Sequence, residues 1–187
     1  TQTLLYHLAR LKHGQRIPDL PIFLDSPMAI NATETFERHP NEHKLTRQQC
    51  HEAFDVATYV RDPEDSKALD RSAMPMVLVS ASGMATGGRV LHHLMHFAPD
   101  PRNTILFAGF QAGGTRGAAM VAGAREVKIF GNYVPVKAEV QNMDMFSAHA
   151  DADEIMAWLG GFRRPPTMTF VTHGEPAAAD ALRHRIE

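Results

Sequence analysis

The stretch MVLVSASGMATGGRVLHHL, Met76 to Leu94, contains an apolar run, a glycine-rich turn and a helical pattern in immediate succession. The run from Met76 to Ala81 is short, rich in valine and bounded by Pro75 and Gly83, which predicts a buried strand. Residues Gly87 to Phe97 follow with the spacing of a helix. A buried strand that turns sharply into a helix is the repeating unit of α/β proteins.

The same alternation extends from this stretch in both directions. The first residues already have the spacing of a helix, with leucines at Leu4, Leu5, Leu8 and Leu11. The sequence predicts further helices over Met28–Arg38, Thr46–Val60, Thr115–Ala124, Asp151–Leu159 and from Ala177 onward, and strands over Pro21–Asp25, Thr104–Gly109, Glu126–Phe130, Val134–Val140 and Thr167–Thr172. The charged segment 61–72 is expected to be exposed. This pattern predicts an α/β fold with a largely parallel sheet covered by helices on both faces.

Composition limits the classes of protein to which the chain can belong. It has 187 residues, of which 44% are hydrophobic and 21% charged, as expected for a globular core. The net charge of −2 gives no overall attraction to nucleic acid, so any phosphate binding requires a local patch. The single cysteine, Cys50, excludes an intrachain disulfide, and no apolar run is long enough to span a membrane, so a reducing cytoplasm fits best. Because the chain starts inside a helical pattern without an initiator methionine, we expect a segment of a longer protein.

The loop from Asp25 to Ala29 places a carboxylate and a hydroxyl at the end of a predicted strand. In open α/β sheets, ligands bind beyond the carboxyl ends of the strands, where loops and helix N-termini converge. A functional role for Asp25 or Ser26 and simple capping of the next helix are equally compatible with this pattern.

Two glycine-rich turns, Ser80–Arg89 and Gly109–Gly117, follow neighbouring predicted strands. Small residues let backbone N–H groups approach a phosphate, and each turn carries a cation near its end, Arg89 or Arg116. Either turn alone is explained as well by tight packing, and neither matches the dinucleotide fingerprint or the P-loop. Two such turns on adjacent strands make a shared anionic ligand a stronger hypothesis.

Two histidines follow apolar runs near the C-terminus. His149 lies in FSAHAD, and His173 ends the predicted strand in THGE. An imidazole can bind zinc or act as a general acid near neutral pH, but a solitary histidine after a strand is more often structural. A zinc site needs three or more protein ligands, so these two residues do not complete one.

A second histidine cluster lies in RVLHHLMHF. His92 and His96 are one helical turn apart and have the spacing of a shared metal site. No glutamate follows the first histidine, so the HExxH pattern of zinc proteases is absent. The neighbouring Leu91, Leu94 and Met95 favour ordinary helix packing for His92, His93 and His96.

Six motifs in a fixed order resemble the β-CASP branch of the metallo-β-lactamase superfamily. They are DSPMA, SASGMATGGRVLHHL, GFQAGGTRG, VPVKAEV, FSAHAD and VTHGEP, and the resemblance extends over nearly the whole chain. The closest likeness is to RNA-processing members related to the nuclease subunit of the eukaryotic polyadenylation machinery. The resemblance implies a β-CASP domain over residues 1–142, with its start missing. Residues 143–187 would then be the C-terminal segment of a metallo-β-lactamase αββα domain that metabolises RNA.

The resemblance also implies roles for individual residues. His149 corresponds to the family's motif B histidine, which contacts the scissile phosphate and protonates the leaving oxygen. His173 corresponds to the motif C histidine, a ligand of one of two zinc ions. The likeness also strengthens Ser80, Ser82, Arg89 and Arg116 as contacts to RNA in the phosphate-facing loops.

The family's HxHxDH motif is absent from this sequence. We therefore expect a zinc-dependent ribonuclease as the full-length protein, which cleaves RNA phosphodiester bonds, and an inactive chain when these residues are isolated. A catalytically silent RNA-binding or scaffold subunit is the main alternative, and a small-molecule hydrolase of the same superfamily is disfavoured by the inserted domain. RNA is the expected partner in the cytoplasm, with no membrane, and a homodimer of the full-length protein stays open.

Overall fold

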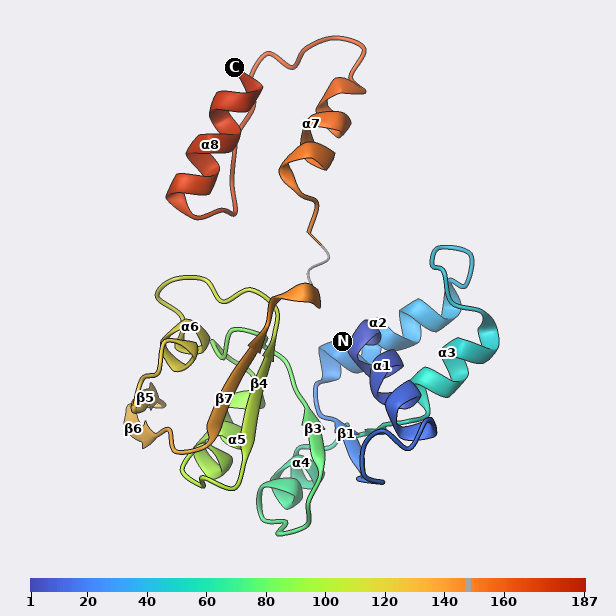
Figure 1. Cartoon of the computed structure of the whole chain (residues 1–187), viewed down its shortest axis with the longest axis vertical. Helices are drawn as coiled ribbons and strands as arrows, with labels where there is room; N and C mark the ends of the chain where they lie inside the picture. The colour runs from blue at the N-terminus through green and yellow to red at the C-terminus, as the bar shows by residue number, and fades with distance from the viewer. Residues whose placement is uncertain (147–148) are drawn as a thin grey trace. The chain divides into compact units, whose positions relative to one another are not determined.

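The computed structural model describes residues 1–146 and 149–187. The chain divides into two compact units, Thr1–Phe146 and Ser147–Glu187, which we call unit 1 and unit 2 (Figure 1). The predicted boundary after Asn142 stays a prediction.

Three short parallel strands organise the first half of unit 1. Strand β1 (Ile22–Leu24) lies between β2 (Thr58–Tyr59) and β3 (Val77–Val79). Its residues pair with both neighbours, for example Phe23 with Thr58 and Leu24 with Val79. The ends of β1 and β3 therefore deliver the following loops to the same edge of the sheet.

Two further strand pairs form the second half of unit 1. Strands β4 (Thr104–Ala108) and β7 (Glu139–Met143) are parallel. Strands β5 (Glu126–Ile129) and β6 (Asn132–Pro135) form an antiparallel hairpin. The α/β class and the parallel pairing predicted from the sequence are confirmed, with this hairpin as the exception.

Six helices surround these strands in unit 1. They are α1 (Gln2–His13), α2 (Pro27–Arg38), α3 (Arg47–Phe54), α4 (Pro63–Asp70), α5 (Val90–Phe97) and α6 (Arg116–Val121). Side-chain caps fix several of their starts: the Ser26 hydroxyl accepts the N–H of Ala29, and Thr46 forms a capping box with Gln49. Helices α1 to α3 gather beside β1, whereas α5 and α6 lie with β4 and β7 (Figure 1).

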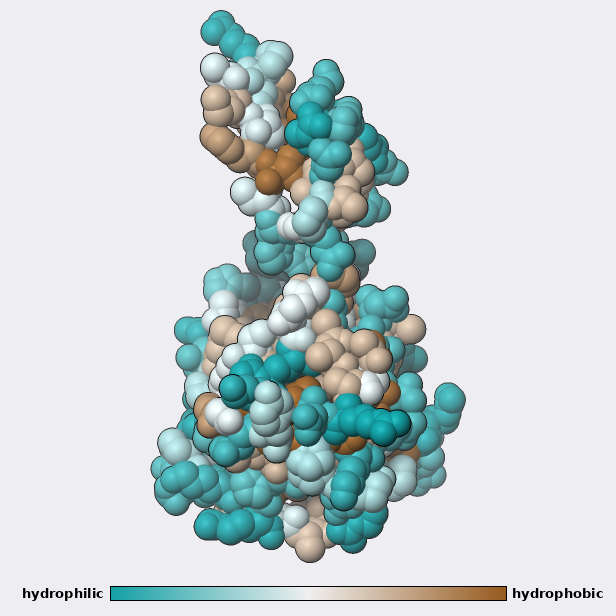
Figure 2. All heavy atoms as spheres, turned by 90° about the vertical axis from the view of Figure 1, so that its left-hand side faces the viewer, coloured by the Kyte–Doolittle hydropathy of each residue, from teal (hydrophilic) through white to brown (hydrophobic). Residues whose placement is uncertain are grey.

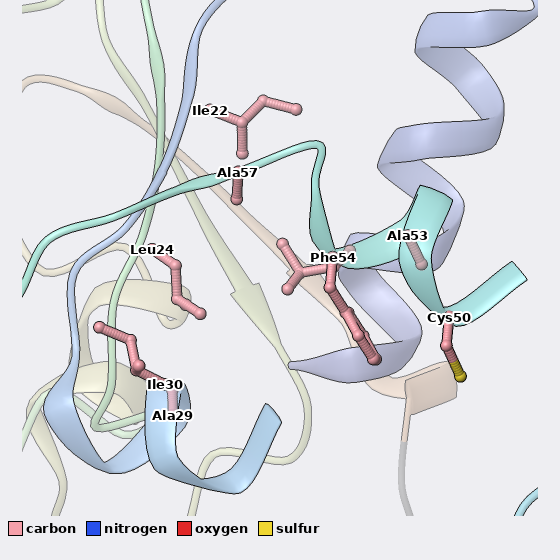
Figure 3. Packing of buried hydrophobic residues seen from close by; sticks show 9 residues of the cluster. Ile22, Leu24, Ala29, Ile30, Cys50, Ala53, Phe54 and Ala57 are labelled. Carbon is pink, nitrogen blue, oxygen red and sulfur yellow. The ribbon is translucent and has the colours of Figure 1, made fainter. Parts of the chain in front are cut away.

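Unit 1 contains two hydrophobic clusters. The first joins α1, β1, α2 and α3 through Leu5, Leu24, Ile30 and Phe54, each at most 2% exposed. Figure 3 shows Phe54 of α3 among the residues of this cluster. The second cluster lies around Met120 and joins α5, β4, α6 and the β5–β6 hairpin. Since the carboxyl ends of β1 and β3 rest on the first cluster, its packing fixes the loops that follow them.

One predicted helix in the middle of unit 1 was wrong in its extent. The helix expected over Thr46–Val60 ends at Phe54, because Val60 donates its N–H to Leu24 and the chain enters β2. The charged segment 61–72, expected to be exposed, is mostly exposed and forms α4, which Asp62 caps at its start. Burial of Ser66 on α4 shows that this helix also has an inward face.

Two predicted strands also differ. Val134–Val140 is divided between β6 and β7, because the N–H groups of Lys137 and Ala138 both donate to the carbonyl of Ala98. The segment Thr167–Thr172 forms no strand in the described structure, and its Phe170 is 78% exposed. A strand requires a neighbour for its backbone hydrogen bonds.

Unit 2 consists of α7 (Ala152–Gly160) and α8 (Pro176–Ile186). An ion pair of 2.6 Å between Arg185 and Asp153 joins the two helices. Among residues 149–187 no side chain is buried, and Trp158 is 66% exposed. Nowhere in the part of the chain that the structure describes is a helix long and apolar enough to cross a membrane.

Candidate RNA and metal site

The two histidines of the C-terminal motifs lie next to each other in unit 2. The ring centroids of His149 and His173 are 5.5 Å apart, with the planes inclined by 33°. Both residues are exposed. Ser147 and Ala148, which belong to the FSAHAD motif, lie outside the described residues. The structure thus brings together the two histidines that the sequence singled out, while their chemical roles stay predictions.

The backbone around each histidine is held by local structure. Asp151 caps α7 by accepting the N–H groups of Asp153 and Glu154, and Glu154 accepts the N–H of Asp151 in return. His173 has a φ of 60°, an unusual conformation for a residue other than glycine. Such strained positions concentrate at functional sites.

The described residues do not group into a complete zinc site. Within ranges 1–146 and 149–187, no three His, Cys, Asp or Glu side chains are grouped so that they could hold a metal ion. A structural zinc has four protein ligands and a catalytic zinc usually has three. His149 and His173 therefore provide too few donors by themselves.

The first glycine-rich turn, Ser80–Arg89, is anchored to the end of β1. The Ser80 hydroxyl donates to the backbone carbonyl of Asp25 at 2.9 Å. The Ser82 hydroxyl lies 3.0 Å from the Thr86 hydroxyl inside the turn. Gly88 has a φ of +81°, and a Cβ there would lie 3.1 Å from the carbonyl oxygen of Ala81. A glycine is therefore required at this position for the turn to close.

Arg89, predicted to contact RNA, points into unit 1. Its guanidinium lies 2.5 Å from a carboxylate oxygen of Asp25 and donates to the carbonyls of Val60 and Arg61 at 2.9 and 2.7 Å. Only 18% of its side chain is exposed. These contacts give Arg89 a structural role, since it holds the first glycine-rich turn to the ends of β1 and β2. Its contact with RNA stays a prediction.

Asp25 is the centre of a buried polar network that the sequence did not reveal. Its side chain is fully buried and accepts hydrogen bonds from Arg89, from the Ser66 hydroxyl and from His93. The other ring nitrogen of His93 lies 2.6 Å from a carboxylate oxygen of Asp70. His93 is structural, as predicted, but through carboxylates instead of apolar contacts.

The loop from Asp25 to Ala29 was compatible with helix capping or with a functional role. In the structure Ser26 caps α2, and Asp25 organises the buried network. His93, Asp70 and Ser66 were missed as partners of Asp25. The only local signal was a carboxylate at the end of a buried strand.

The two glycine-rich turns contact each other, although the strands before them, β3 and β4, belong to different sheets and are not the neighbours that the sequence suggested. Arg116 donates from Nη to the carbonyl of Ala85 at 3.1 Å and from Nε to the carbonyl of Lys128. Gln111 donates to the carbonyl of Gly83 at 2.9 Å. Beside this contact lies a shallow groove of about 430 Å³, lined by Thr86, Gly114, Thr115, Arg116, Ala119, Glu126, Val127 and Lys128. The groove presents hydroxyl and cationic groups, together with one carboxylate.

Two family models match the chain. The Beta-Casp domain matches residues 1–120, and the Zn-dependent metallo-hydrolase RNA specificity domain matches residues 133–187. The second match contains both His149 and His173.

The chain is also similar to proteins of bacteria and archaea. It is 41% identical to Ribonuclease TTHA0252 of Thermus thermophilus, over 97% of this chain and 42% of that protein. It is 32% identical to the Transcription termination factor FttA of Pyrococcus abyssi, over 84% of this chain and 26% of the relative. An RNase J-like protein of Methanocaldococcus jannaschii is 29% identical over 86% of this chain and 37% of its own length.

The chain therefore spans about two fifths of the ribonuclease and less of the other two relatives. By the family model that covers most of its length and by the order of its motifs, the chain belongs to the β-CASP family of the metallo-β-lactamase superfamily.

Proposed function

We propose that the full-length protein containing this chain is a metal-dependent ribonuclease that hydrolyses RNA phosphodiester bonds in RNA processing or decay. The observation that carries this proposal is the pair formed by His149 and His173, whose rings are 5.5 Å apart within the segment matched by the RNA specificity domain. Relatives named as ribonucleases support the same reaction.

In this proposal the two histidines have different tasks. His149 donates a hydrogen bond to the scissile phosphate and passes its proton to the leaving oxygen, which an imidazolium can do near neutral pH. His173 supplies one imidazole ligand to zinc. Because the described residues provide too few donors, most ligands for two zinc ions must come from residues outside this chain. We accordingly propose that the 187-residue chain alone does not cleave RNA.

The two glycine-rich turns are the proposed contacts to the RNA backbone. Ser80 and Ser82 belong to the first of these turns, and Arg116 lines the groove beside it. Arg89 supports this surface by holding the turn to Asp25, and its remaining exposed part is available to a phosphate. We place the β-CASP domain at residues 1–142 and its RNA-metabolising partner domain at 143–187.

The site of action proposed is the cytoplasm, where a reduced Cys50 and an RNA substrate are both expected. A homodimer of the full-length protein is part of the same proposal. Size-exclusion chromatography with light scattering tests the dimer independently of catalysis.

The experiment measures bound zinc and RNA cleavage on the full-length protein, its His149→Ala and His173→Ala variants, and the chain alone. We expect about two zinc ions per full-length protein, as paired-metal hydrolysis requires. We expect His173→Ala to lose both metal and activity, and His149→Ala to keep the metal but lose cleavage. Cleavage by the chain alone, abolished in its own His173→Ala variant, would show that the chain is sufficient. If the full-length protein binds RNA but neither holds metal nor cleaves, it is a silent RNA-binding subunit instead.

A further inference from the structure

The β5–β6 hairpin presents two exposed aromatic rings, one of which lies beside a cation. Tyr133 is 66% exposed and lies opposite Lys128 in the antiparallel register. The Lys128 ammonium is 5.8 Å from the centroid of the Tyr133 ring. Phe130, at the turn, is 55% exposed. The inward side chains Val127, Ile129 and Val134 belong to the second hydrophobic cluster, so the outward face rests on a fixed base.

Phe130 occupies a conformation that its side chain disfavours. Its φ is 47°, and it precedes Gly131 with a φ of 86° in the two-residue turn between β5 and β6. Turns of this kind favour Asn or Gly at the first position, and a bulky residue there is an outlier. The Phe130 ring lies 4.9 Å from the His92 ring, which supports it from α5. A phenylalanine at this position therefore contributes little to folding stability. An exposed ring that is held in one place suggests a functional reason for the residue instead.

The charge around the hairpin differs from that of the chain as a whole. From Arg116 to Lys137 the sequence carries four cations and one carboxylate, Glu126, although the chain has a net charge of −2. Lys128 belongs both to the exposed face of the hairpin and to the groove shared with Thr86 and Thr115. Figure 2, viewed from the side of α6 and the hairpin, shows hydrophobic and strongly hydrophilic side chains intermixed on this face of unit 1.

Exposed aromatics next to cations are the surface by which proteins bind single-stranded nucleic acid. Bases stack on the rings irrespective of sequence, and the cations attract the phosphates. We propose that the β5–β6 hairpin binds single-stranded RNA, with Tyr133 and Phe130 stacking bases and Lys128 contacting a phosphate. The choice of RNA as ligand rests on the proposed function, whereas the position of the surface rests on the hairpin itself. The groove leads from this surface to the glycine-rich turns.

The experiment measures fluorescence anisotropy of a labelled oligouridylate of about 20 nucleotides, which spans more than one stacking site, with the full-length protein. We expect Tyr133→Ala to weaken binding about tenfold, within the range for loss of one base stack. Lys128→Ala should lower the slope of log affinity against log salt by about 0.7, the value for one phosphate of a single strand. Lys67→Ala, an exposed lysine on α4, is the charge-matched control and should change neither quantity.

Phe130→Gly separates a binding role from a structural one. Glycine tolerates the positive φ, so we expect the thermal midpoint to stay or rise while RNA affinity falls. Unchanged affinity in both Phe130→Gly and Tyr133→Ala overturns the RNA surface, even if the full-length protein cleaves RNA. Conversely, loss of affinity in these variants upholds the surface even if cleavage is absent, so its failure and that of the ribonuclease proposal are distinguishable.

Discussion

The Nε2 atom of His93 lies 2.8 Å from a carboxylate oxygen of Asp25, although the two residues are 68 positions apart in the sequence. This contact joins α5 to the end of β1 within the buried network. Because the loop after β3 carries the proposed phosphate contacts Ser80 and Ser82, and Ser80 donates to the carbonyl of Asp25, the network helps to determine where that loop lies. The contribution of this network to folding stability can be measured without any assay of RNA cleavage.

Asp25→Asn should destabilise unit 1 by about 3 kcal/mol, as expected when one member of a buried ion pair is removed. The neutral amide leaves the largely buried guanidinium of Arg89 without its anionic partner. Urea-induced unfolding followed by far-ultraviolet circular dichroism measures the change. Asp19→Asn, in a pair whose carboxylate is 88% exposed, should cost less than about 1 kcal/mol. Equal losses of stability in the two variants would show that the buried network stabilises unit 1 no more than an exposed ion pair does.

Gly117→Ala should destabilise unit 1 by about 1–3 kcal/mol, the usual cost of overpacking. An added Cβ would lie 1.8 Å from the side-chain oxygen of Gln111 and 3.2 Å from the backbone carbonyl of Met84. Gln111 would have to move and give up its hydrogen bond to Gly83, which joins the two glycine-rich turns. Thermal unfolding provides the measurement. The matched control is Gly87→Ala, where nothing lies within 4 Å of the added atom, and a similar loss there would contradict the steric explanation.

The raised pKa of Tyr59 predicts a loss of folding stability at alkaline pH. Burial, and then the carboxylates of Glu37, Asp55 and Glu34, raise the pKa of Tyr59 from 10.0 to about 12. The folded protein therefore keeps this proton while the unfolded chain releases it, and stability falls as the pH rises from 10 to 12. Phenolate absorbance should show a late-titrating tyrosine that disappears in Tyr59→Phe. The variant should also lose less stability than the wild type across this range, and identical profiles would refute the assignment.

Cys50 should react slowly with thiol reagents. Burial, and then the carboxylate of Glu37, raise the pKa of the Cys50 thiol, so little of the reactive thiolate forms near neutral pH. Its side chain is only 6% exposed. Alkylation by iodoacetamide, followed by mass spectrometry, should be much slower in the folded protein than in urea. Glu37→Gln should accelerate the folded reaction modestly, whereas a rate equal to that in urea would show that the thiol is accessible.

Much of unit 1 could be predicted from the sequence because its signals are local. The apolar runs that become β1, β3 and β4 are bounded by turn residues, and α2 is announced by Ser26 and Pro27. The division of Val134–Val140 could not be predicted, because it depends on two hydrogen bonds to the carbonyl of Ala98.

The candidate site could likewise be predicted only where its sequence signals are local. His149 and His173 could be selected because each lies in a recognisable short motif, and the structure brings the two rings together. The partners of Asp25 lie 41 and 68 residues away, on α4 and α5, so no local pattern contains them. The inward direction of Arg89 was likewise invisible, since a cation after a glycine-rich turn has the same sequence whether it binds a phosphate or a buried carboxylate.

The absence of buried side chains among residues 149–187 has a calorimetric consequence. The heat capacity increment of unfolding arises mainly from apolar surface that becomes newly exposed to water. Melting of α7 and α8 in this chain exposes little such surface, so the two helices should add almost nothing to the increment. A scanning calorimetry endotherm of the 187-residue chain would therefore report on the two hydrophobic clusters of unit 1, and would barely register whether the segment with both histidines is folded.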